Sequence, residues 1–291
     1  MNSLTLRSPS KINLYLRVTG RRSNGYHELV TLFHRISLFD QMELRKKKAG
    51  FDLKCSNPNL ACDETNLITK AYRLLKQFVP DLPGVSVKLI KKIPLAAGLG
   101  GGSGNAATFL LGMNKLYQLK LSRKKLVQVG KKLGADVAFF LYEVNQALGL
   151  ELGDKIKPWP VKKGLNFILV ISDKGLSTKM VYQNLPKKLP SVSLTKEMST
   201  VRILRKLLDR KDFKQTSQFL INDLESVAIS LRPSIQKTIR RLKQVGLNYV
   251  RMSGSGPTVF AILSDRKQAG DFCRRLRRIG PGLRVISCQT F

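Results

Sequence analysis

The sequence predicts an α+β protein built from two domains. Segments with the two-residue period of strands and segments with the helical period occur in both halves of the 291-residue chain. A connection rich in proline, lysine and glycine lies at residues 155–164. The chain is long enough for one large or two modest domains, so we place a boundary there, with domains at 1–156 and 157–291.

The first half is expected to hold three strands and three helices. Over residues 12–18 apolar and polar residues alternate, which puts Lys11 and Asn13 on one face of a half-buried strand. A turn ending at Gly25 precedes a second strand. Further along, a helix, a third strand and two more helices are predicted, the last helix stopping at Gly134. The ranges are strands 12–18, 30–38 and 85–90, and helices 66–78, 106–117 and 122–133.

The second half repeats the mixture of strands and helices without any internal sequence repeat. Two of its strands flank a tight Gly-Ser-Gly turn, which is typical of a hairpin. The strands are expected at 166–172, 249–252, 258–263 and 284–288, and the helices at 199–208, 215–231, 234–245 and 265–279.

Charge is the unusual feature of the composition. The chain has 52 lysines and arginines against 19 acidic residues, a formal net charge of +33. Such a balance is compatible with nucleic acid or another polyanion. The basic residues are spread over the chain and lack interleaved aromatics, which favours a solvated basic surface. We therefore expect no nucleic-acid partner.

Several other classes of protein are not expected. No apolar stretch approaches eighteen residues, so no membrane span or membrane partner is predicted. The first residues lack a secretory signal, and the four cysteines show neither metal-ligand nor tight disulfide spacing. A cytoplasmic protein with free thiols, either a monomer or a homodimer, is expected.

A glycine-rich segment between a predicted strand and a predicted helix is the strongest motif. Glycines let a backbone approach a ligand closely, and free N–H groups at a helix start favour phosphate. No Gly-Lys-Ser/Thr follows, which excludes a Walker A loop, and the glycine spacing does not fit the dinucleotide fingerprint. A flexible linker is disfavoured because an apolar-periodic helix follows directly. The predicted phosphate loop comprises Pro94, Leu95, Ala96, Ala97, Gly98, Leu99, Gly100, Gly101, Gly102, Ser103 and Gly104.

Two charged residues could take part in phosphoryl transfer. Asp136 lies inside an apolar run just after a helix end, where it could accept a proton from an attacking alcohol. The alternative is that Asp136 is the N-cap of a short helix. Lys11 could stabilise charge on a transferring phosphoryl group, although most lysines are simply exposed.

Two further motifs are weaker. Tyr26 and His27 follow a turn and could stack on and hydrogen bond to a base or sugar, although a lone histidine is usually structural. A second glycine loop around Gly254 and Gly256 could present backbone N–H groups to an anion or could be only a hairpin turn.

Taken in order, these motifs resemble those of the GHMP kinases. Pro-Ser-Lys-Ile-Asn-Leu at 9–14, the glycine loop at 94–106 and Gly-Ser-Gly-Pro-Thr at 254–258 correspond to the three motifs of that family. Gly-Tyr-His-Glu-Leu at 25–29, Glu-Thr-Asn-Leu at 64–67 and Leu-Gly-Ala-Asp-Val at 133–137 are similar to the members that phosphorylate 4-diphosphocytidyl-2-C-methyl-D-erythritol in non-mevalonate isoprenoid biosynthesis. The resemblance spans nearly the whole chain.

The resemblance implies a fold and an activity. The fold would be a domain like the second domain of ribosomal protein S5 followed by a ferredoxin-like domain, with the active site in the cleft between them. ATP, with Mg²⁺, would phosphorylate the 2-hydroxyl of the acceptor, giving the 2-phosphate and ADP. The acceptor would be a small molecule, and another GHMP kinase activity (homoserine or mevalonate type) or an RNA-binding S5-like protein are the alternatives.

The resemblance also implies roles for individual residues. Asp136 would be the general base and Lys11 the electrostatic stabiliser, with the glycine loop and Asn66 holding ATP. The acceptor would contact Asn13, Tyr26, His27, Thr178 and Tyr182. No metal ligand is assigned, and only Glu151 and Asp154 come into consideration.

Two positions depart from the family pattern. Ala138 stands where proline is usual, which could loosen the turn that carries Asp136. Gly104 stands where a second serine is usual, which removes one hydroxyl from the glycine loop.

Overall fold

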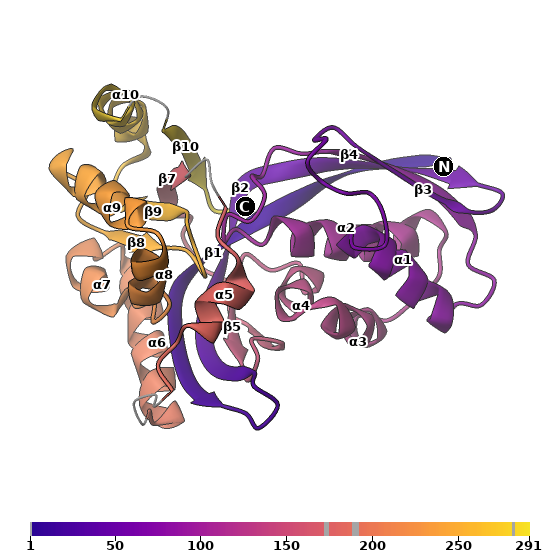
Figure 1. Cartoon of the computed structure of the whole chain (residues 1–291), viewed down its shortest axis with the longest axis horizontal. Coiled ribbons are helices and arrows are strands. Elements are labelled where there is room, and N and C mark those ends of the chain that lie inside the picture. Colours follow the sequence, from indigo (N-terminus) through magenta and orange to yellow (C-terminus); the bar gives the residue numbers. More distant parts are fainter. Residues whose placement is uncertain (1, 172–174, 188–191, 281–282) are drawn as a thin grey trace. The chain divides into compact units, whose positions relative to one another are not determined.

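The computed structural model describes residues 2–171, 175–187, 192–280 and 283–291 (Figure 1). Contacts divide the chain into two compact units that interleave along the sequence. Strands β1 (Ser3–Arg21) and β2 (His27–Lys47) contribute residues to both units. The predicted domain boundary between residues 156 and 157 cuts the sequence once, whereas these units each combine several stretches of the chain. The domain boundary therefore stays a prediction. The first unit comprises Met1–Ser10, Leu38–Leu95 and Gly100–Val144, and the second comprises Lys11–Ser37, Ala96–Leu99 and Asn145–Phe291.

The first unit combines part of a six-stranded sheet with four helices. The second half of β2 pairs antiparallel with β4 (Gly84–Ile90), and β4 pairs parallel with β3 (Phe51–Cys55). Met42 and Leu44 of β2 are fully buried, as the alternating pattern of a one-sided sheet requires. The helices gather on one side of these strands: α1 (Leu67–Phe78), α2 (Gly101–Leu116), α3 (Arg123–Leu133) and α4 (Ala135–Leu141) (Figure 1).

The second unit contains a four-stranded antiparallel sheet with the order β10-β7-β9-β8. In chain order this is fourth, first, third, second, the arrangement of a ferredoxin-like domain, so that expectation is confirmed. Its strands are β7 (Asn166–Ile171), β8 (Val250–Met252), β9 (Val259–Leu263) and β10 (Arg284–Gln289). The unit also contains the other part of the six-stranded sheet, in which the first half of β2 pairs with β5 (Gln146–Leu150) and β5 pairs with β6 (Lys155–Pro158).

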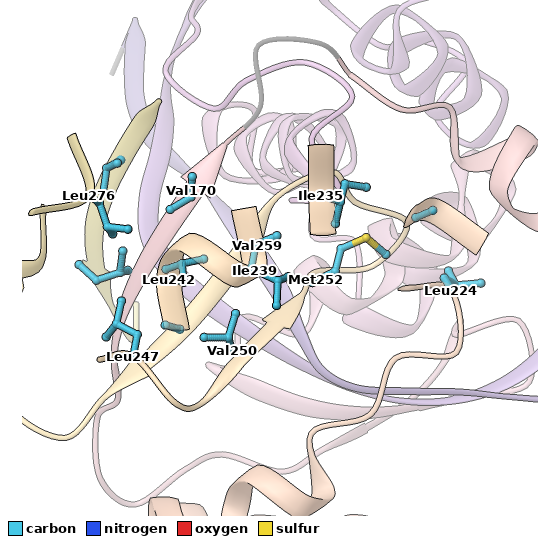
Figure 2. Packing of buried hydrophobic residues seen from close by; sticks show 14 of the residues in the cluster. Val170, Leu224, Ile235, Ile239, Leu242, Leu247, Val250, Met252, Val259 and Leu276 are labelled. Atoms are coloured by element: carbon cyan, nitrogen blue, oxygen red, sulfur yellow. The ribbon is translucent and has the colours of Figure 1, made fainter. Parts of the chain in front are cut away.

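Helices cover the four-stranded sheet and form the core of this unit. Apolar side chains of β7, β8 and β9 pack against those of α9 and α10, and Figure 2 shows residues of this cluster, including Val170, Ile239, Leu242, Val259 and Leu276. The helices of the unit are α5 (Thr178–Gln183), α6 (Leu194–Arg210), α7 (Phe213–Phe219), α8 (Glu225–Leu231), α9 (Ser234–Gln244) and α10 (Ala269–Ile279), with a 3₁₀ turn at Arg266–Gln268.

The structure corrects several sequence-based element assignments. The single helix expected at 215–231 is two helices, α7 and α8, because residues 220–224 bond to other parts of the chain. Strand β6 occupies part of the expected connection at 155–164. Strands β3 and β5 and helix α5 were not predicted as elements, and α4 was considered only as the short helix that Asp136 could cap. Residue 172, the predicted end of β7, lies outside the described residues.

Candidate functional site

Lys11 belongs to a buried chain of hydrogen bonds in the second unit. Its Nζ donates to Asn13 Oδ1 at 2.7 Å, and the ammonium lies 5.5 Å from the centroid of the Phe33 ring. Asn13 Nδ2 donates to Thr31 Oγ1 at 2.7 Å, and that hydroxyl donates to Tyr15 O at 2.7 Å. These bonds fix which end of the Asn13 amide faces Lys11. Asn13 therefore holds the Lys11 ammonium through its side-chain oxygen, and its contact with an acceptor stays a prediction.

The glycine loop turns through left-handed backbone conformations. Ala96, Gly98 and Gly100 have φ values of 49°, 72° and 66°. Residues Ala96–Leu99 belong to the second unit, where Lys11 N donates to Leu99 O at 2.9 Å. The strand that carries the candidate lysine is thus bonded directly to the glycine loop.

The two glycine loops contact each other through their backbones. Ser253 Oγ donates to Gly98 O at 3.1 Å, and a Cβ placed on Gly98 would lie 2.4 Å from Ser253 O. A Cβ on Gly254 would lie 3.3 Å from Lys11 Nζ and 3.1 Å from Asn13 Oδ1. The second loop is therefore more than a hairpin turn, because it lies against both the first loop and the candidate lysine.

Thr178 is also next to the second glycine loop. Its Oγ1 lies 2.8 Å from Ser255 Oγ, and either hydroxyl can be the donor. Thr178 is the first residue of α5, which is capped by Ser177 through a bond to Met180 N. The Thr178 hydroxyl is thus held against the hydroxyl of Ser255, which is part of the second glycine loop.

Gly104 belongs to the first unit, and its departure from the family pattern has a packing reason. It is buried in α2, and a Cβ there would lie 2.5 Å from the carbonyl oxygen of Pro9. Backbone atoms cannot move aside as a flexible side chain can. The missing hydroxyl is therefore linked to a close approach of α2 to β1.

A buried ion pair that sequence reasoning missed supports both ends of the glycine loop. Lys91 and Asp40 form a salt bridge in which both side chains are almost fully buried. Asp40 Oδ1 accepts from Ile93 N at 2.8 Å, directly before the loop, and Oδ2 accepts from Asn105 Nδ2 at 2.9 Å, directly after it. A lone aspartate at the end of an apolar strand segment was the available signal.

Asp136 lies in the first turn of α4 and is half-buried. The N-cap of that helix is Gly134, so the alternative interpretation of Asp136 as the cap is wrong. Ala138 is fully buried within α4, and the helix begins before it. The helix therefore forms without the usual proline, and a looser turn around Asp136 stays a prediction.

Two of the three predicted base-binding residues form an aromatic pair. The His27 and Tyr182 rings have centroids 5.5 Å apart and planes inclined at 33°. His27 is buried, and that burial, with the nearby Arg21 charge, lowers its pKa. Tyr26 is 63% exposed, which leaves a ring face open to a ligand.

Asn66 has a structural role at the start of α1. Its Oδ1 accepts from Ile68 N at 2.9 Å as the N-cap, and its Nδ2 donates to Ala61 O at 2.7 Å. Both ends of the side-chain amide are therefore engaged within the chain. A contact between Asn66 and adenine stays a prediction.

The described residues contain no cluster of three or more potential metal ligands. Glu151, one of the two acidic residues considered, accepts from Lys155 and forms an ion pair with Arg22. These cations lower the pKa of Glu151. Glu151 is thus already paired with two cations, and a role for it in holding Mg²⁺ stays a prediction.

None of the helices in the described parts of the chain combines the length and apolar character that crossing a membrane requires.

Comparison with known proteins places these features in a family. Residues 66–144 match the GHMP kinases N terminal domain and residues 204–282 the GHMP kinases C terminal domain. A protein of Syntrophus aciditrophicus named 4-diphosphocytidyl-2-C-methyl-D-erythritol kinase is 38% identical over 98% of both chains. One of the same name from Acetivibrio thermocellus is 36% identical over 92% of this chain and 93% of its own.

Solved structures agree in fold. A crystal structure of 4-(cytidine 5'-diphospho)-2C-methyl-D-erythritol kinase has a TM-score of 0.81 and 30% identity over 98% of both chains. A homoserine kinase from Cytophaga hutchinsonii has a TM-score of 0.76 at 19% identity, covering all of this chain and 95% of its own, and supports the fold alone. The chain belongs to the GHMP kinase family, in the group whose curated members are named 4-diphosphocytidyl-2-C-methyl-D-erythritol kinase.

Proposed function

We propose that this protein uses ATP to phosphorylate the 2-hydroxyl of 4-diphosphocytidyl-2-C-methyl-D-erythritol. The observation that carries the proposal is the grouping of Lys11, Asn13 and the two glycine loops, with Gly98 against Ser253 and Gly254 beside the lysine. Backbone-rich loops around a fixed ammonium group suit a polyphosphate. The names of the full-length relatives support the choice of acceptor.

In the proposed reaction the acceptor 2-hydroxyl oxygen attacks the γ-phosphorus of ATP. A new oxygen–phosphorus bond forms, the bond between the γ-phosphorus and the bridging oxygen breaks, and ADP leaves with that electron pair. The hydroxyl proton passes to the Asp136 carboxylate. Lys11, held in place by Asn13, offsets negative charge on the phosphoryl oxygens.

Mg²⁺, when bound to the nucleotide phosphates, would supply further charge neutralisation. The protein's own part is positioning. Bonds from Lys11 N to Leu99 O and from Ser253 Oγ to Gly98 O hold the glycine loop to the lysine strand and to the second loop. Such fixed geometry accounts for much of the catalysis in phosphoryl transfer.

The cytidylyl group of the acceptor is assigned to Tyr26, His27 and Tyr182. An exposed tyrosine ring and a paired histidine and tyrosine offer stacking surfaces and a ring nitrogen that can hydrogen bond to a base. Thr178 lies against Ser255 of the second glycine loop, so these two residues offer a pair of adjacent hydroxyls. Homoserine and mevalonate carry no base, so these aromatic residues favour the cytidylyl acceptor.

The test is an ADP-release assay with 4-diphosphocytidyl-2-C-methyl-D-erythritol, homoserine and mevalonate as competing acceptors. We expect turnover with the first at a kcat/KM at least about a hundredfold above the others. Preference for homoserine or mevalonate would contradict the proposed acceptor while leaving the kinase assignment intact. Salt-sensitive binding of generic RNA without turnover of any acceptor would contradict the kinase proposal itself.

A further inference from the structure

The break between helices α7 and α8 is a short segment, residues 220–224, that bonds to strand β1. Leu16 N donates to Ile221 O at 2.8 Å, and Asp223 N donates to Leu16 O at 3.0 Å. The Asp223 side chain accepts from Val18 N at 2.8 Å. The segment is therefore fixed against the strand that carries the candidate lysine.

The same segment holds the second glycine loop. Asn222 Nδ2 donates to the carbonyl oxygens of Met252 and Gly254, each at 2.8 Å. Its Oδ1 accepts from Leu224 N at 3.0 Å, so both donors and the acceptor of the amide are used. Glu225 Oε2 accepts from Met252 N at 2.8 Å. Because Asn222 is 8% exposed, water cannot readily replace these bonds.

Apolar packing anchors the segment as well. Leu224 and Met252 belong to the same buried cluster, and Figure 2 shows both among its residues. The loop that Asn222 holds brings Gly254 close to Lys11, since a Cβ on Gly254 would lie 3.3 Å from Lys11 Nζ. A shift of the second glycine loop would therefore change the surroundings of the Lys11 ammonium group.

We propose that Asn222 is a positioning residue for phosphoryl transfer, which sets the second glycine loop against Lys11. The proposal rests on the proposed function. Asn222 bonds two carbonyl oxygens of the loop, and the backbone of its own segment is bonded to β1, so it links the loop and the lysine strand through one side chain. In phosphoryl transfer, misplacement of a group by about 1 Å can cost roughly a hundredfold in rate.

The test compares Asn222→Asp with a matched control, Asn114→Asp. The substitution at 222 keeps the shape and replaces the Nδ2 donor with an oxygen facing two carbonyl oxygens. Asn114 also bridges backbone groups, since its Nδ2 donates to Leu121 O at 3.0 Å and its Oδ1 accepts from Leu121 N at 2.9 Å. It connects α2 to the turn before α3 within the first unit, whereas Asn222, Lys11 and the second glycine loop belong to the second unit.

We expect Asn222→Asp to lower kcat by roughly 10- to 100-fold while the KM for ATP changes by less than about twofold. Asn114→Asp should leave both constants near those of the unaltered protein. In a Lys11→Met background, Asn222→Asp should cause less than about a twofold further loss, because its effect passes through Lys11. Equal kinetics for the two aspartate variants, or full additivity with Lys11→Met, would overturn the proposal.

Hydrogen exchange gives a readout that needs no acceptor. Amides of residues 253–256 should exchange faster in Asn222→Asp than in the unaltered protein or in Asn114→Asp. A uniform rise over the whole second unit, or no rise at the loop, would reduce Asn222 to a general structural role and overturn the proposal. If the unaltered protein phosphorylates none of the three acceptors, the proposed function has failed, and this exchange comparison still decides whether Asn222 holds the loop.

Discussion

Gly98 and Ser253 join two glycine-rich segments that lie about 155 residues apart in the chain. The serine hydroxyl donates to Gly98 O at 3.1 Å, and the carbonyl oxygen of Ser253 occupies the place where a side chain on Gly98 would begin, 2.4 Å from its Cβ. Gly98 also has a φ of 72°, which disfavours any other residue. Two independent constraints therefore require glycine at this position.

Gly98→Ala should destabilise the protein by about 2–4 kcal/mol, from the left-handed conformation and from the clash with Ser253 O together. The matched control is Gly246→Ala, because Gly246 has a φ of 95° and no atom within 4 Å of its Cβ. The control should cost only about 1–2 kcal/mol. Urea unfolding measures the free energy of unfolding of both variants. Equal losses of stability in Gly98→Ala and Gly246→Ala would show that the contact with Ser253 contributes nothing.

Gly104→Ser, which restores the residue usual in the family, should destabilise this chain by about 1–3 kcal/mol because its Cβ would meet Pro9 O at 2.5 Å. Gly102→Ala on the same helix meets only Leu67 Cδ1, at 3.5 Å. That control should be neutral or stabilising by up to about 1 kcal/mol, as alanine favours helix. A stable Gly104→Ser variant would contradict the packing explanation of this departure.

Asp136→Asn should lower kcat by roughly two to four decades, because the amide cannot accept the hydroxyl proton. ATP affinity, measured by equilibrium titration, should change little. Asp81→Asn removes a carboxylate from an exposed position of the same unit and serves as the control. A near-normal rate for Asp136→Asn would remove that residue from the role of base.

His27→Ala should raise the KM for the cytidylyl acceptor more than the KM for ATP, and equal weakening of both would contradict the assignment of His27 to the base. The pH dependence gives a second test. Burial and the Arg21 charge lower the pKa of His27, so its ring stays neutral to a pH below the usual range. Acceptor KM should therefore rise only in acid, and Arg21→Gln should move that rise to higher pH.

His34 should make the stability of the fold depend on pH. Burial lowers its pKa to about 3 from the ordinary 6.5. Nδ1 accepts from Gln146 Nε2 at 3.2 Å and Nε2 donates to Thr290 Oγ1 at 3.0 Å, an arrangement that requires a neutral ring. Below pH 6.5 the unfolded chain binds a proton that the folded chain does not, so stability should fall by about 1.4 kcal/mol per pH unit as pH decreases toward 3.

His34→Gln should remove most of this slope in urea unfolding measured between pH 6 and 4. The chain has only one other histidine, His27, and His27→Ala should retain most of the slope, since His27 has the smaller resolved shift. An unchanged slope in His34→Gln would mean that acidic side chains, rather than His34, cause the loss of stability as the pH decreases.

The amino-acid sequence alone was enough to predict the glycine loop, the strand with Lys11 and Asn13, and the mixed α+β class. These depend on local signals, namely glycine content, a two-residue or helical period, and turn residues close together in the chain. The family resemblance added the roles of Asp136, His27 and Tyr182, because it relies on several motifs in a fixed order. The base and acceptor roles remain predictions, and the kinase family is confirmed by the relatives.

The contacts between segments that are distant in the sequence became visible only in the three-dimensional structure. Three such contacts join residues between 30 and 155 positions apart. They are the contact of Gly98 with Ser253, the hydrogen bonds from Asn222 to Met252 O and Gly254 O, and the ion pair of Asp40 with Lys91. No local pattern encodes such pairs, because each partner alone looks like an ordinary turn, surface or strand-end residue. The helix expected at 215–231 shows the same limit, since helical periodicity could not reveal that residues 220–224 would instead bond to β1 and to the second glycine loop.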